Sequence, residues 1–120
     1  MAIVFAIQGW TQTPATLPYL CDFEDPNEIS QWNLSNSTCV NRWAFGQAVT
    51  ATGFSGTSMY ISNDSISNAY TNSTVYTVVA SRAIVSDGSG FYQISFDFNC
   101  QGESSFDFVK VFVVPNDTNY

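Results

Sequence analysis

The sequence contains no histidine and only three basic residues, against ten acidic residues, in a chain of 120. Without histidine the chain lacks the usual general base near neutral pH, the Ser-His-Asp arrangement and the commonest zinc ligand. Its net charge of −7 would repel the phosphates of nucleic acids and anionic lipid headgroups, so we expect no nucleic-acid partner. Any catalysis would have to use carboxylates alone.

Long apolar runs are also scarce. The apolar stretch in residues 1–13, MAIVFAIQGWTQT, is too short to span a bilayer, so we expect no membrane insertion. Small and polar residues follow it, which is typical of the end of a secretory signal, here without a basic n-region. The alternative is a first β-strand with Ile3, Phe5 and Ile7 on one face. A signal would make the protein secreted or attached to the cell surface.

Export would suit the three cysteines, because an oxidising compartment lets two of them pair. Three thiols without a histidine and without C-x-x-C spacing are a poor zinc signature, which favours one disulfide and one buried thiol. The simplest pairing joins Cys21 to Cys39, because it closes a shorter loop than a bond to Cys100.

The composition is rich in Phe, Tyr, Val, Ser, Thr and Asn and poor in Leu, Lys and Glu, which favours an all-β fold. The clearest signal is the strict alternation of apolar and polar residues over 92–100, followed after a short turn by 105–115. Residues 24–28 indicate a turn, residues 63–73 a polar loop, and no helix of ordinary length fits. Further strands are expected at residues 19–24, 31–34, 58–62 and 75–85.

Three acids raise the question of a cation. Asp107 falls on the valine face of the strand 105–115, where an unpaired charge is costly. Either Arg82 or a bound cation would compensate this charge. In the strand 19–24, Asp22 and Glu24 share one face and repel each other unless a cation lies between them.

Calcium takes six to eight oxygen ligands at about 2.3–2.6 Å, from carboxylates, amide carbonyls and the backbone. The chain has no EF-hand loop. A composite site would therefore join Glu24 and Asp107 to Asn63 and Asp64 of the polar loop. The alternative is that the acids are solvated and that Asp107 pairs with Arg82.

Catalysis by a pair of carboxylates, as in glycosidases, needs two acids facing each other across a cleft. No acid is marked for that role, so we expect a protein that is not an enzyme. Sugar-binding sandwiches instead stack sugar rings on exposed aromatic side chains. Tyr70, inside the polar loop, is the aromatic residue expected to contact a ligand, whereas Trp32, Trp43 and Tyr60 are expected in the core.

Several motifs taken in order resemble a known family: LPYLCDFED, WNLSNSTCVNRWAFG, SMYISND, NAYTNS, SRAI and YQISFDFNCQGESSFDFVKVFVVP. Residues 17–115 resemble the adhesin-like jelly-roll domains of Bacteroidetes surface proteins, of the choice-of-anchor J type. These are related to the cleaved-adhesin domains of gingipains and, more distantly, to MAM domains. The resemblance implies a calcium-stabilised antiparallel β-sandwich of jelly-roll type over residues 17–120. It also implies a non-catalytic role in binding carbohydrate or a host or matrix protein.

Carried over by position, the resemblance makes Glu24 and Asp107 calcium ligands, with Asp64 and Asp22 as weaker candidates. The alternative role is an ancillary structural or substrate-targeting domain of a secreted peptidase or glycoside hydrolase. The family's domain normally continues beyond the strand 105–115, so the last strands of the jelly roll are expected to be missing. An exposed edge strand would then invite an edge-strand dimer, and a missing ligand would weaken the calcium site.

Overall fold

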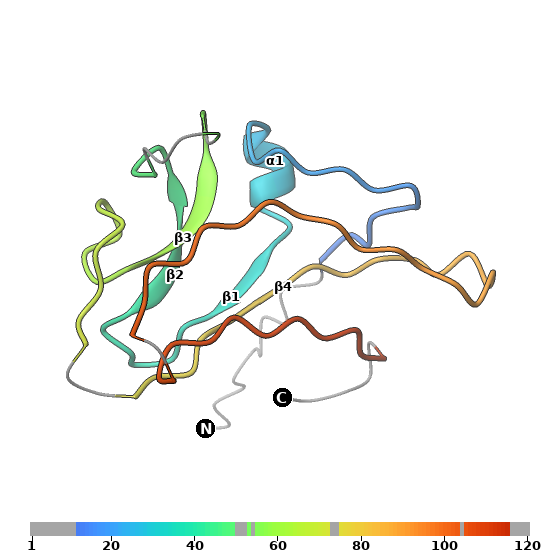
Figure 1. The fold of residues 1–120 in the computed structure, drawn as a ribbon. Coiled ribbons are helices and arrows are strands. Elements are labelled where there is room, and N and C mark those ends of the chain that lie inside the picture. Colours follow the sequence, from blue (N-terminus) through green and yellow to red (C-terminus); the bar gives the residue numbers. More distant parts are fainter. Residues whose placement is uncertain (1–11, 50–52, 54, 73–74, 104, 116–120) are drawn as a thin grey trace, which may run out of the picture. The chain divides into compact units, whose positions relative to one another are not determined.

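The fold was obtained as a computed structural model, which describes residues 12–49, 53, 55–72, 75–103 and 105–115 (Figure 1). The chain divides into two compact units, Met1–Asp87 and Gly88–Tyr120, which are described separately. The first unit carries the regular elements: α1 (Pro26–Ile29), β1 (Asn33–Ser35), β2 (Arg42–Gly46), β3 (Ser58–Ser62) and β4 (Val79–Ser81). Within the described residues the regular structure is therefore β with minimal helix, and no helix there is long and apolar enough to cross a membrane.

The four strands form two small antiparallel sheets (Figure 1). In one sheet β2 pairs with β3, and Ala44 lies opposite Tyr60. In the other sheet β1 pairs with β4, and Leu34 lies opposite Ala80. The predicted antiparallel β-structure is confirmed at this level, but the described residues form two-stranded sheets and no sandwich.

The core of the first unit centres on β2 and β3. Ala44 and Tyr60 are only 8% and 7% exposed, and Ser62 is fully buried two residues further along β3. The Tyr60 hydroxyl donates to the Ile66 carbonyl over 3.2 Å. The same hydroxyl oxygen lies 2.8 Å from the position that a Cβ on Gly46 would take. A larger residue at position 46 would therefore collide with Tyr60. This core is small, and polar contacts must complete it.

Asn36 connects the two sheets. It follows β1 directly, and its side chain accepts a hydrogen bond from the Trp43 amide over 2.9 Å and donates to the Trp43 carbonyl over 3.3 Å. The Trp43 indole donates to the carbonyl of Val78, just before β4, over 3.2 Å. A side-chain amide thus takes the place of a neighbouring strand along β2, because it offers the same donor and acceptor.

The sequence predictions for this unit have mixed outcomes. The strand at 58–62 is confirmed as β3, and the described part of the polar loop, residues 63–72, contains no strand. The strand predicted over 75–85 is too long, since Val79–Ser81 is the strand there and Ile84 adds only an isolated bridge to Ala15. The strand predicted over 31–34 begins later, at Asn33.

The strand predicted over 19–24 is wrong. Phe23 adopts a positive φ of 61°, in the left-handed region, which interrupts an extended chain. Its ring lies 5.6 Å from the ring of Trp32 and 5.6 Å from that of Phe45. These contacts between distant residues outweigh the local strand pattern. Without a strand at 19–24, the prediction that Asp22 and Glu24 share one strand face no longer holds.

The second unit departs furthest from the sequence pattern. The rings of Phe96 and Phe98 lie 6.0 Å apart, as a period of two predicts. Residues 88–103 and 105–115 nevertheless contain no strand, so the predicted pairing of 92–100 with 105–115 is not formed there. The amides of Phe106 and Asp107 instead donate to the Glu103 carbonyl over 3.0 and 3.1 Å, which forms a turn.

Replacing Asn36 with alanine should destabilise the first unit by about 1–3 kcal/mol, because the partly buried Trp43 amide loses its acceptor. Chemical unfolding, followed by tryptophan fluorescence, measures this change. The matched control is Asn33→Ala, which removes an exposed asparagine from β1. Equal stability of the two variants would contradict a bridging role for Asn36.

Candidate functional site

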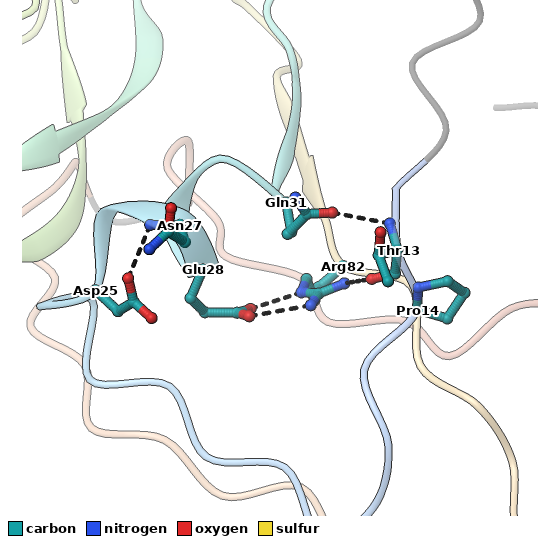
Figure 2. A pocket seen from close by; sticks show the side chains of 7 residues that line it. All are labelled: Thr13, Pro14, Asp25, Asn27, Glu28, Gln31 and Arg82. Carbon is teal, nitrogen blue, oxygen red and sulfur yellow. Dashed lines mark hydrogen bonds and ion pairs between the residues drawn. The ribbon is translucent and has the colours of Figure 1, made fainter.

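The first unit contains an open pocket of about 340 Å³ (Figure 2). It lies between the chain segment that precedes the helix, the helix α1 with its cap, and the residue that follows β4. The lining residues are Thr13, Pro14, Asp25, Asn27, Glu28, Gln31 and Arg82. None of them was predicted as a site residue from the sequence.

The segment at residues 12–15 forms one wall of the pocket because it is fixed along the chain that follows β4. The Gln12 side chain donates to the Ser81 carbonyl over 3.1 Å and accepts from the Ala83 amide over 2.9 Å. The Ala15 amide donates to the Ala83 carbonyl, and the Val85 amide donates to the Ala15 carbonyl. The secretory remnant was predicted at residues 1–13, of which residues 1–11 lie outside the described part of the chain.

An ion pair forms the floor of the pocket. Arg82 Nε and Nη2 donate to the two carboxylate oxygens of Glu28 over 2.6 and 3.1 Å. Its Nη1 donates to the carbonyls of Thr13 and Ala83 over 2.7 and 3.1 Å. The Arg82 side chain is 5% exposed and that of Glu28 is 24% exposed, so water screens this pair weakly.

Tyr19 completes the cluster. Its hydroxyl donates to Glu28 Oε1, and its ring centre lies 5.5 Å from the Arg82 guanidinium carbon. The Arg82 hydrogen bond holds the pKa of Glu28 below its usual range, while burial and the bond to Glu28 raise the pKa of Tyr19. Each group therefore keeps one charge state around neutral pH, which suits a structural pair and not an acid or base that exchanges protons.

The helix presents the opposite wall. Asp25 is its N-cap and accepts a hydrogen bond from the Asn27 amide over 2.8 Å, and Pro26 occupies the first turn. Gln31, just beyond the helix, accepts from the Thr13 amide over 2.8 Å. The sequence DPNE has the spacing of a capping box, which predicts the start of a helix. The turn predicted at residues 24–28 did not take this spacing into account.

The polar loop at residues 63–72 is a second feature of the first unit. The Asp64 carboxylate accepts hydrogen bonds from the amides of Ile66 and Ser67, both over 2.8 Å, and from the hydroxyls of Ser62 and Ser67, both over 2.9 Å. These bonds hold the pKa of Asp64 well below its usual range. One acid thus organises the first half of the loop.

The second half of the loop is fastened to the chain before β2. Asn41, which is 8% exposed, donates to the Thr71 carbonyl over 2.6 Å and accepts from the Thr71 amide over 2.7 Å. The Asn63 amide donates to the Ala69 carbonyl over 2.9 Å. Tyr70, the predicted ligand contact, lies between these anchors in the sequence and is half-buried.

The structure gives each predicted metal ligand a protein partner. Glu24 accepts from the Thr57 amide over 2.5 Å and from its hydroxyl over 3.2 Å, and Asp22 accepts from the Glu24 amide over 3.0 Å. Asp107 belongs to the second unit and accepts from the Glu103 amide over 2.6 Å. Arg82, the alternative partner expected for Asp107, is engaged by Glu28.

Among the described residues, no three acidic or cysteine side chains come together as a group that could hold a metal ion. Calcium needs six to eight oxygen ligands. The backbone amides that donate to Glu24 and Asp64 supply none of them. The three cysteines are thiols in the structure, with Cys21 and Cys39 half-buried and Cys100 exposed. A bond between Cys21 and Cys39 stays a prediction.

Glu28 should make the stability of the first unit depend on acid pH. Its pKa is lower in the folded chain than in the unfolded chain, so its contribution is fully present above the unfolded value of about 4.3 and is lost as pH falls through the folded value. Glu28→Gln should be less stable than wild type at pH 7, and the difference should shrink below about pH 4. Urea unfolding at a series of pH values measures it.

Asp64→Asn is the control for this experiment, because Asp64 also has a lowered pKa but belongs to the loop. Replacing Glu28 with glutamine should therefore change the pH profile in the Asp64→Asn background as it does in the wild-type background. A stability difference that stays constant from pH 7 to pH 3 would contradict the role of the charged pair.

The comparisons with known proteins add no family to these observations. No family model, no curated protein and no solved structure matches the chain. The function is therefore argued from the loop, the pocket and the chemistry of their side chains.

Proposed function

We propose that this chain is a non-catalytic, adhesin-like jelly-roll module, secreted or exposed at the cell surface, that binds carbohydrate or a host or matrix protein. The observation that carries the proposal is the ordered polar loop at residues 63–72. Asp64 fixes one half of this loop with four hydrogen bonds, and the reciprocal bonds between Asn41 and Thr71 fix the other half. The motif resemblance over residues 17–115 supports the same function.

A fixed loop suits binding because the conformational entropy of the loop is lost when the chain folds and not when the ligand binds. Tyr70 gives this loop a half-buried aromatic residue, and its neighbours Ala69 and Thr71 are hydrogen-bonded to Asn63 and Asn41. Such a ring packs on the apolar face of a sugar, and the neighbouring hydroxyl, amide and carboxylate groups meet the polar edge. Binding through hydrogen bonds and one aromatic face needs no catalytic group.

Calcium is part of the proposal. Asp64, Glu24 and Asp22 of the first unit and Asp107 of the second unit are proposed as separate candidate ligands, because no three of the described acids come together. Carboxylates and loop carbonyls are the oxygen ligands that calcium prefers. Because protein donors already engage these carboxylates, the ion would have to share their oxygens. The expected effect is added stability, with no part in a reaction.

Tyr70→Ala should weaken binding to a glycan array or to immobilised mucin by about two- to tenfold, since one aromatic contact is worth about 0.5–1.5 kcal/mol. Tyr76→Ala is the matched control, because Tyr76 is also half-buried but lies outside the loop. A wild-type chain that binds no glycan and no matrix protein would contradict the function. Equal binding by the two variants would contradict the role of Tyr70.

Calcium should raise the midpoint of thermal unfolding relative to chelator, because a ligand that binds only the folded state adds about 2.7 kcal/mol at one hundred times its Kd. Magnesium at the same concentration controls for ionic strength. The increase should become smaller in Glu24→Gln and in Asp64→Asn. An unchanged midpoint in the wild type would show that calcium does not stabilise the chain.

A further inference from the structure

The pocket of Figure 2 has a floor whose charges are already paired. Both carboxylate oxygens of Glu28 accept hydrogen bonds from Arg82, and the remaining Arg82 nitrogen donates to the Thr13 and Ala83 carbonyls. The positive charge therefore has little capacity left for an anion. Recognition in this pocket must come from the groups above the floor.

These groups combine donors with acceptors. Asp25 uses one carboxylate oxygen to cap the helix, and its other oxygen is not needed for the cap. The Asn27 backbone takes part in the cap, so its side-chain amide remains available on an exposed residue. Gln31 uses its oxygen for Thr13, while its nitrogen makes only a long bond of 3.4 Å to Ser30. The rim thus offers a carboxylate oxygen and two amide groups.

A ligand rich in hydroxyl groups matches this rim. A hydroxyl donates to a carboxylate or an amide oxygen and accepts from an amide nitrogen, so adjacent hydroxyls satisfy both kinds of group. Pro14 adds an apolar wall, which suits the C–H face of a sugar ring (Figure 2). The pocket volume of about 340 Å³ is at the lower end of the range of about 300–1,000 Å³ for small-molecule sites.

We propose that this pocket binds a single pyranose residue of a saccharide through Asp25, Asn27 and Gln31. The inference rests on the proposed function and adds a sugar contact distinct from the Tyr70 loop. A cationic amine is the competing ligand, but Asp25 alone would attract it, and salt screens an exposed carboxylate strongly. The rim carries one exposed carboxylate beside two neutral amide groups, and this mixture of donors and acceptors favours hydroxyl groups over a cation.

The test is a titration of the full ¹⁵N-labelled chain with the methyl pyranosides of glucose, galactose and mannose, each added separately. At least one should shift the side-chain amide signals of Asn27 and Gln31 in a saturable way. Asn27→Ala should weaken this binding about fivefold, which corresponds to one hydrogen bond of about 1 kcal/mol. The variant should fold normally, because the helix cap uses the Asn27 backbone amide.

Asn99→Ala is the matched control, since it removes an exposed asparagine from the second unit and should bind like wild type. The pocket assignment is overturned if none of the three pyranosides moves these signals, if Asn27→Ala binds as tightly as Asn99→Ala, or if methylammonium moves the signals and the sugars do not. Glycan-array binding that Tyr70→Ala abolishes and Asn27→Ala leaves intact would overturn the pocket and keep the proposed function. Saturable pyranoside shifts without any binding to arrays or mucin would keep the pocket and overturn the function.

Discussion

The bidentate pair between Arg82 and Glu28 is the interaction on which the arrangement of the first unit depends. One guanidinium joins the helix α1, the end of β4 and the segment at residues 12–15, because its donors reach Glu28, Thr13 and Ala83. A side chain only 5% exposed has little water to replace a lost partner. Removing either charge would leave the other one poorly solvated, so the pair must be kept or replaced as a whole.

The same unit uses amide side chains where a larger protein would use more strands. Asn36 binds both backbone groups of Trp43, and Asn41 binds both backbone groups of Thr71. Gln12 acts similarly on Ser81 and Ala83. A small core around Ala44 and Tyr60 buries little apolar surface, so unpaired backbone groups near it would be costly. Carboxamides suit this task because each carries a donor and an acceptor.

Local patterns predicted the parts of the fold that are locally determined. The strand β3 and the polar loop after it were found because five strand residues are followed by residues that bond to their own backbone. The strand over 19–24 failed because the left-handed conformation of Phe23 accompanies contacts with Trp32 and Phe45, which no local pattern contains. The strong alternation over 92–100 describes the spacing of side chains and does not specify a pairing partner.

The candidate site shows the same division. The helix cap at Asp25 and the acid at Glu28 could be predicted from the spacing in DPNE. Arg82 could not be assigned to Glu28, because the two residues are 54 positions apart and Asp107 was an equally reasonable partner on charge alone. The role of Asp64 was predictable in kind, since an aspartate in a loop of serines and asparagines commonly accepts local amides.

The acidic stretch at residues 22–25 now has a structural explanation that does not require a cation. Asp22 accepts the amide of Glu24, Glu24 accepts the amide of Thr57, and Asp25 accepts the amide of Asn27. Each carboxylate thus accepts a hydrogen bond from a backbone donor, so each acid of the stretch has a structural partner. Glu24 uses both oxygens on Thr57, whereas Asp22 and Asp25 each use one oxygen in the bonds described above. Asp25 is the acid of this stretch best placed to meet a ligand, because it lines the pocket.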